Sequence, residues 1–150
     1  MPEATSSSNK ILIKAVGRCL CGAIELHATE VNPHIGACHC STCRGWGGGA
    51  LLAVDCGSAV TIKGTNPDRL QVYKSSEWAE RGFCGDCGTH LFYRIKKTQQ
   101  HIVNVGLFDE LKEFELDHQI FVDEKPDYYE FKNKTKMMTG AEVFAMYAPE

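Results

Sequence analysis

Clustered cysteines are the feature of this sequence that most constrains its fold. The chain has 150 residues and eight cysteines, a lower share than the ~8–10% that is typical of a disulfide scaffold. Only Cys56 stands alone, and it is expected to be a buried apolar filler or else an inert surface thiol. The other seven form the clusters Cys19-Leu20-Cys21-Gly22, Cys38-His39-Cys40-Ser41-Thr42-Cys43 and Cys84-Gly85-Asp86-Cys87-Gly88. In a reducing compartment such clusters indicate metal ligation rather than disulfide bonds.

The first residues of the chain bear on the compartment. Residues 1–16 have neither the cationic start nor the apolar stretch of ~7–15 residues that a secretory signal requires. The sequence also has no run of ~18 apolar residues that would predict a membrane-spanning helix. We therefore expect a cytoplasmic protein with reduced thiols. A secreted disulfide protein is the disfavoured alternative, because it would need an export signal.

The charge pattern argues against nucleic acid as a partner. The sequence has 16 Lys and Arg against 19 Asp and Glu, which gives a formal charge of -3, and the basic residues are scattered. Proteins that bind nucleic acid concentrate basic residues in a patch or stripe. We expect no nucleic acid and no membrane as partners, while a few basic residues suffice for one small anionic ligand. The sequence makes no prediction about oligomeric state.

Short runs of branched and aromatic residues predict a mainly β fold. They alternate with Gly, Asn and Asp from residue 11 to residue 105, as strands joined by turns do. Within one run, Ile24, Leu26 and Ala28 share a face of an extended segment, which is typical of a sheet with one solvated side. The candidate strands are Ile11–Val16, Ala23–Ala28, Ala50–Val54, Val60–Lys63, Leu70–Lys74, His90–Ile95, His101–Val105 and Gln119–Val122.

Helices are predicted to be few and short. A helical turn is expected after Cys40, and glycines at 45, 47, 48 and 49 should end it quickly. A weak helix is expected over Ala141–Tyr147. Outside these segments, Ser75, Ser76 and Arg81 are expected to brace a turn.

Two of the cysteine clusters suit one structural metal site. In Cys84-x-x-Cys87-Gly88 the turn brings both sulfurs to one ion, and the glycine can adopt the positive φ that follows the second ligand. Cys19-x-Cys21 has a tighter spacing and is also followed by glycine. The simplest closure joins the two pairs into one site, with four sulfurs around one zinc ion. Such a closed shell has a structural role, and its binding contributes to folding.

The third cluster leaves Cys38, Cys40 and Cys43 as a group of three. Three protein ligands with an open fourth position describe a reactive zinc site. The alternative is that a histidine closes the site. The candidates are His34, His39 and His90, of which His90 lies just past the Cys84-x-x-Cys87 turn. His39 should point away from the metal if its segment is extended.

The number of sulfurs decides which chemistry suits the open site. Three thiolates cancel more than the whole charge of one zinc ion, so this ion is a weaker Lewis acid than one held by histidines. Capture of a thiol, whose pKa the metal lowers, therefore suits the site better than activation of water. We expect the open position to receive the sulfur of a small thiol.

Four motifs follow one another in a specific order between about Gly17 and Phe131. They are Gly17-Arg18-Cys19-Leu20-Cys21-Gly22, Cys38-His39-Cys40-x-x-Cys43-Arg44, Tyr73-x-Ser75-Ser76 and Arg81-x-Phe83-Cys84-x-x-Cys87-Gly88-Thr89-x-Leu91. This order resembles the glutathione-dependent formaldehyde-activating family, which includes centromere protein V. The resemblance implies a zinc-stabilised β-tent of short antiparallel strands. It also implies a structural zinc on Cys19, Cys21, Cys84 and Cys87 and a catalytic zinc on Cys38, Cys40 and Cys43.

The same resemblance implies an activity. Family members add glutathione to formaldehyde, a reaction classed as that of a carbon-sulfur lyase in its reverse direction. We therefore predict an enzyme with two zinc ions that reversibly adds glutathione, its co-substrate, to formaldehyde or a related small aldehyde. Arg44 is the candidate for binding a glutathione carboxylate, and its alternative role is a structural hydrogen bond to the metal loop. The predicted domains are a disordered lead-in at 1–10, the zinc domain at 11–131 and a C-terminal extension at 132–150.

Two segments depart from the family pattern. Members often carry Pro followed closely by Trp near the end of the domain, where this chain has Pro126-Asp127-Tyr128-Tyr129. The run Gly45-Trp46-Gly47-Gly48-Gly49 is unusually rich in glycine. Both departures can reshape the substrate pocket, although packing is the default expectation for the two tyrosines.

Two other functions compete with the lyase. One is a non-catalytic zinc module that binds a protein partner through its sheet and whose second zinc is also structural. The other is a zinc-ribbon nucleic-acid binder, which the acidic balance disfavours. An exchangeable fourth ligand at the three-sulfur site would separate the enzyme from the module.

Overall fold

The computed structural model describes residues 11–110 and 112–147, so the lead-in predicted at 1–10 lies outside the described residues. The chain forms two compact units, each assembled from separated stretches of sequence. We call the described part of His34–Leu52 and Phe114–Glu150 the three-cysteine unit, and that of Ile11–Pro33 and Ala53–Glu113 the four-cysteine unit. The boundaries expected for the zinc domain and the C-terminal extension stay a prediction.

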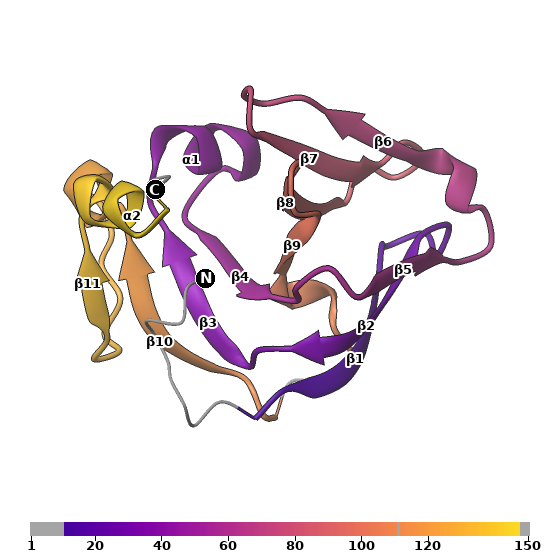
Figure 1. The fold of residues 1–150 in the computed structure, drawn as a ribbon, viewed down its shortest axis with the longest axis horizontal. Coiled ribbons are helices and arrows are strands. Elements are labelled where there is room, and N and C mark those ends of the chain that lie inside the picture. The colour runs from indigo at the N-terminus through magenta and orange to yellow at the C-terminus, as the bar shows by residue number, and fades with distance from the viewer. Residues whose placement is uncertain (1–10, 111, 148–150) are drawn as a thin grey trace. The chain divides into compact units, whose positions relative to one another are not determined.

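A three-stranded antiparallel sheet forms the first part of the four-cysteine unit (Figure 1). Its order is β1 (Ile13–Arg18), β2 (Glu25–Val31) and β5 (Val60–Lys63). Leu26 is 0% and Ala28 is 3% exposed, whereas Glu25 and His27 on the other face contact each other at 2.9 Å. The alternation predicted for this strand is therefore present.

Five strands follow one another in the second sheet of this unit, and all their pairings are antiparallel. The strands lie in the order β4 (Leu51–Asp55), β9 (Gln100–Asn104), β8 (His90–Ile95), β7 (Ala79–Cys84) and β6 (Leu70–Tyr73). Of β4, residues 53–55 belong to this unit, and they pair with β9. Leu91, Phe92 and Val103 are fully buried between these strands. A Cβ at Gly82 would overlap the Phe92 ring on the neighbouring strand, so this close approach requires glycine. Short 3-10 helices lie at Pro67–Arg69 and Val105–Leu107.

The three-cysteine unit combines parallel strands with short helices. β10 (Glu115–Ile120) pairs in parallel with both β3 (His34–Cys38) and β11 (Lys136–Met138), and Figure 1 shows these strands side by side. The expectation of antiparallel strands is wrong for these three. Parallel neighbours need long crossover connections, and long stretches of chain separate each pair here. The helices are α1 (Ser41–Gly47), a 3-10 turn (Val122–Glu124) and α2 (Gly140–Tyr147).

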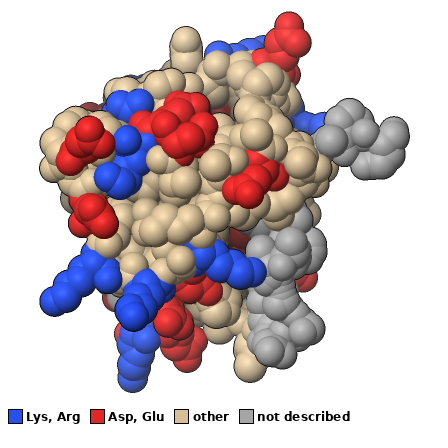
Figure 2. Space-filling model, turned by 90° about the vertical axis from the view of Figure 1, so that its left-hand side faces the viewer, with Lys and Arg blue, Asp and Glu red and all other residues tan. Residues whose placement is uncertain are grey.

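The predicted mainly β fold with few short helices is confirmed. The helical turn expected after Cys40 is α1, which ends where Gly48 adopts a left-handed φ of 89°. None of the helices in the described ranges is long and apolar enough to cross a membrane. On the face shown in Figure 2, Lys and Arg side chains lie beside Asp and Glu side chains.

Candidate metal centres

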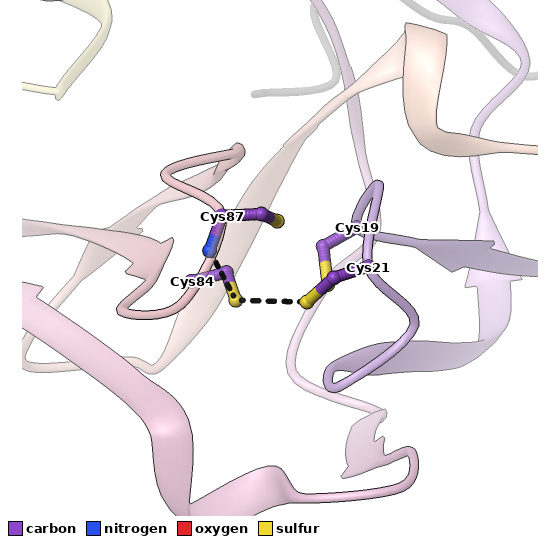
Figure 3. Close-up of side chains that lie close together, drawn as sticks. All are labelled: Cys19, Cys21, Cys84 and Cys87. Carbon is purple, nitrogen blue, oxygen red and sulfur yellow. Dashed lines mark hydrogen bonds between the residues drawn. The ribbon is translucent and has the colours of Figure 1, made fainter.

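Four sulfurs converge in the four-cysteine unit. Cys19 and Cys21 lie in the turn after β1, Cys84 ends β7, and Cys87 lies in the turn that follows. The four Sγ atoms all lie within 4.8 Å of one another. The distance is 3.7 Å between Cys19 and Cys21 and 3.8 Å between Cys21 and Cys84. Figure 3 shows the side chains pointing toward one another from two loops, an arrangement that could hold one metal ion.

Backbone N–H groups stabilise these sulfurs. Ile24 donates to Cys19 Sγ at 3.3 Å, and Asp86 and Cys87 donate to Cys84 Sγ at 3.4 and 3.5 Å. Hydrogen bonds to a thiolate favour its charged form, which is the form that binds metal. The glycines at 22 and 88 have φ of 81° and 80°, so both turns use the positive φ expected from the sequence.

Thr89 links the two loops of this cluster. Its hydroxyl lies 3.1 Å from Cys87 Sγ and accepts a hydrogen bond from the Leu20 N–H at 3.1 Å. Hydrogen bonds from the Thr89 side chain and backbone lower the pKa of the Cys87 thiol to about 5. The sequence motif contains Thr89, but only the structure shows that it contacts both loops.

Three further sulfurs converge in the three-cysteine unit. Cys38 is the last residue of β3, Cys40 is the N-cap of α1, and Cys43 lies buried in its first turn. Their Sγ atoms lie within 4.8 Å of one another, and Cys40 Sγ accepts a hydrogen bond from the Cys43 N–H at 3.4 Å. Hydrogen bonds with the Cys38 and Cys43 sulfurs lower the pKa of Cys40 to about 2. The hydrogen bonds with Cys40 and Cys43 raise the pKa of Cys38, because three neighbouring sulfurs hold one negative charge more readily than several.

Among the residues that the structure describes, no His, Asp or Glu places a ligand atom within 4.8 Å of all three sulfurs. His39 is fully buried and has both ring nitrogens engaged, Nδ1 with the Tyr129 hydroxyl at 2.7 Å and Nε2 with the Gln119 side-chain oxygen at 2.8 Å. Both ring nitrogens are therefore engaged with other side chains, and neither lies within 4.8 Å of all three sulfurs. His34 pairs with Asp117 at 2.6 Å, and His90 lies on β8 of the four-cysteine unit.

Comparison with known proteins places this arrangement in a family. The sequence matches the family described as "Glutathione-dependent formaldehyde-activating enzyme" over residues 14–124. The chain belongs to this family. The resemblance seen in the cysteine motifs is thereby confirmed.

Two curated proteins and one solved structure are similar to this family member. An uncharacterized lyase of Schizosaccharomyces pombe is 38% identical over 128 residues, which are 85% of this chain and 92% of the relative. A Podospora anserina protein, named provisionally as a glutathione-dependent formaldehyde-activating enzyme, is 34% identical over 83 residues, which are 53% of this chain and 39% of that protein. The crystal structure of a Rhodobacter sphaeroides protein is similar with a TM-score of 0.53 and 26% identity, covering 63% of this chain and 87% of that one.

Arg44 braces the loop that carries Cys38, Cys40 and Cys43 in this formaldehyde-activating family member. Its Nε donates to the His39 carbonyl oxygen at 2.9 Å, which is the structural role that the sequence offered as an alternative. This contact uses one of the five N–H groups of a guanidinium. The observed hydrogen bond is thus compatible with a second, ligand-binding role for the same side chain.

A pocket of about 370 Å³ lies at the C-terminal end of α1 in the three-cysteine unit. Its lining residues are Gly48, Gly49, Ala50, Leu52, Tyr128, Tyr129 and Phe131. Burial raises the pKa of the Tyr129 hydroxyl, and the charges of Arg44 and Cys38 also act on it. Tyr129 does more than pack, because its side chain lines the pocket and its hydroxyl contacts His39 in the loop that carries the three cysteines.

Residues outside the two clusters have the structural roles predicted for them. Ser76 Oγ accepts a hydrogen bond from the Ala79 N–H at 3.2 Å, and Arg81 Nε donates to Ser75 Oγ at 3.3 Å. Cys56 is fully buried. No disulfide joins any of the eight cysteines, all of which lie in the described ranges.

Proposed function

We propose that this chain is a zinc-dependent carbon-sulfur lyase that reversibly adds glutathione to formaldehyde or a related small aldehyde. The observation that carries the proposal is the difference between the two sulfur clusters, one with four sulfurs and one with three. Zinc is tetrahedral in most protein sites, so three ligands leave one position for a substrate. Membership of the family supports glutathione and an aldehyde as the substrates.

The donor sets fit zinc. Cys19, Cys21, Cys84 and Cys87 would hold a structural ion that closes two loops on each other, and Cys38, Cys40 and Cys43 would hold the catalytic ion. Sulfur-rich, tetrahedral sites select zinc over the hard cations that prefer oxygen. Bound at the three sulfurs, zinc would lower the pKa of an incoming thiol and favour its thiolate.

The chain itself contributes binding and orientation to the addition. In the forward direction a bond forms between the thiol sulfur and the carbonyl carbon, the π electrons of the carbonyl move to its oxygen, and the thiol proton ends on that oxygen. No oxidant or reductant is needed. Arg44 would bind a glutathione carboxylate with its outer N–H groups while Nε stays on the loop. Holding both reactants together supplies most of the rate, since each is already reactive.

The cytoplasm is the proposed location, because exposed thiols and metal thiolates persist in a reducing compartment. A non-catalytic zinc module is the competing function. It requires a second metal that is saturated by the protein, and it predicts no response to thiols.

Zinc content and the exchange of formaldehyde with glutathione test the proposal together. Two-dimensional exchange NMR measures interconversion between free glutathione and its hydroxymethyl adduct, with and without the protein. We expect the protein with about two zinc ions per chain to accelerate this exchange. The Cys40→Ser variant should lose the acceleration, and the matched Cys56→Ala variant should keep it. A fully loaded protein that leaves the exchange at its spontaneous rate would favour the module.

A further inference from the structure

We propose that the pocket at the end of α1 binds an apolar or aromatic substituent of the aldehyde, so that the preferred substrate is larger than formaldehyde. This inference rests on the proposed function and names its substrate class. Formaldehyde has only one carbon and one oxygen. A pocket of about 370 Å³ falls within the ~300–1,000 Å³ range of small-molecule sites, which formaldehyde would leave almost empty.

The walls of the pocket are uncharged. Backbone and small side chains from 48–50 form one wall, and Tyr128, Tyr129 and Phe131 contribute aromatic rings. The ring centroids are 5.4 Å apart for Tyr128 and Tyr129, and 6.1 Å apart for Tyr129 and Phe131. Aromatic walls of this kind favour stacked or edge-on rings over polar groups.

The same walls are unsuited to glutathione. The tripeptide has carboxylates at both ends and an ammonium group, and burying such charges without partners costs free energy. Arg44, the candidate for its carboxylate, does not line the pocket. We therefore assign the pocket to the aldehyde and leave the tripeptide to surfaces outside it.

Both walls are linked to the loop of the three cysteines, one through α1 and one through His39. On one side α1 carries Cys43 in its first turn, and the Gly48 N–H caps the same helix by donating to the Arg44 carbonyl at 2.8 Å. On the other side the Tyr129 hydroxyl contacts His39 at 2.7 Å, and His39 lies between two of the cysteines. The pocket and the cluster thus belong to one connected set of contacts within the three-cysteine unit.

The pocket also leaves apolar surface uncovered. Tyr128 is 76% exposed although it lies in the lining, and Leu52 is 37% exposed. A Cβ added at Gly49 would meet no atom within 4 Å, so the space in front of this residue is open. Exposed apolar groups that line a concave surface are typical of ligand sites.

A pair of glycine substitutions tests this inference. Gly49→Leu fills the pocket, and Gly45→Leu is its matched control, because Gly45 also has open space around its Cβ position but does not line the pocket. The first measurement is kcat/KM with glutathione for phenylacetaldehyde and for acetaldehyde. The second is binding of 2-phenylethanol, which carries the ring but no carbonyl, by saturation-transfer NMR.

For the wild-type protein and Gly45→Leu, we expect kcat/KM to be higher for phenylacetaldehyde than for acetaldehyde by about tenfold or more. Gly49→Leu should lose that preference for phenylacetaldehyde over acetaldehyde, and it should lose the binding of 2-phenylethanol. Tyr128→Ala should also weaken the preference for phenylacetaldehyde and the binding of 2-phenylethanol. Because Tyr128 is exposed, this variant keeps the test valid if Gly49→Leu misfolds.

The two proposals fail in different ways. A protein that reacts with formaldehyde and acetaldehyde but excludes phenylacetaldehyde would overturn this inference alone. A protein that accelerates the reaction of no aldehyde would overturn the proposed function, and the substrate claim with it. Equal binding of 2-phenylethanol by the Gly49→Leu and Gly45→Leu variants would show that the ring does not occupy this pocket.

Discussion

The Tyr129 hydroxyl lies 2.7 Å from Nδ1 of His39, a fully buried histidine that stands between Cys38 and Cys40. The other ring nitrogen of His39 contacts Gln119, whose side-chain amide donates to Thr135 Oγ1 at 3.0 Å. Residues far apart in the sequence therefore fix the loop that carries the three sulfurs.

Removing the hydroxyl of Tyr129 should destabilise the fold. In Tyr129→Phe a buried nitrogen of His39 loses its partner, which costs ~1–3 kcal/mol. Urea denaturation should show this loss in the free energy of unfolding. Tyr128→Phe is the matched control, since its side chain is largely exposed and should change stability little. Equal stability of the two variants would contradict the role given to the His39 contact.

The two cysteine clusters should respond differently to substitution. Cys84→Ser opens the four-sulfur site and should yield little soluble, folded protein, because that metal contributes to folding. Cys40→Ser should stay folded with about half of the zinc, and it should lose thiol chemistry. Circular dichroism and zinc analysis of the purified variants measure both effects. Equal loss of folding would argue against one structural and one catalytic site.

Thr89 should strengthen metal binding at the four-sulfur site. Thr89→Val keeps the shape of the side chain but removes the hydroxyl that contacts Cys87 Sγ and the Leu20 N–H. Loss of such a supporting contact lowers metal affinity by ~10–100-fold, which competition with a chromophoric chelator measures. Thr61→Val, at an exposed position on β5, is the control. Unchanged affinity in Thr89→Val would show that the hydroxyl contributes no more than packing.

His101 should make stability depend on pH. It is 5% exposed, and burial, aided by the charge of Arg94, lowers its pKa. The unfolded chain binds a proton near pH ~6.5, whereas folded His101 resists protonation until a lower pH. Stability is therefore retained above the unfolded pKa and falls as pH drops toward the folded pKa.

The comparison of the wild-type protein with His101→Gln isolates this effect, because both contain the same metal sites. The advantage of the wild-type protein in free energy of unfolding at about pH 7.5 should shrink at about pH 5.5. A constant difference between the two proteins at both pH values would show that His101 does not titrate as burial requires.

The strands that the sequence predicted well are those with a simple alternation. In β2, Leu26 and Ala28 are buried, and Glu25 and His27, which alternate with them, are only half-buried. No strand was predicted over β7, because its charged residues Glu80 and Arg81 are typical of a solvated loop. Arg81 on this strand is only 3% exposed, since its guanidinium contacts Ser75 and lies 5.0 Å from the centre of the Tyr93 ring.

The candidate site also has parts that the sequence predicts and parts that it does not. Sulfurs that are close in sequence could be grouped from spacing alone, because the geometry of a short turn is local. The pairing of β3 with β10 and the contact of His39 with Tyr129 depend on chain segments that fold together over long separations. Local patterns carry no signal for such contacts, so the role of Tyr129 emerged only from the structure.

Cobalt substitution tests most directly whether the three-sulfur site accepts a thiol. Cobalt replaces zinc in thiolate sites and has charge-transfer bands that report sulfur ligands. Titration with millimolar glutathione should change the bands of the wild-type protein, and this response should be absent from Cys40→Ser. A spectrum of the doubly substituted wild-type protein that does not change on addition of glutathione would contradict an open position at Cys38, Cys40 and Cys43.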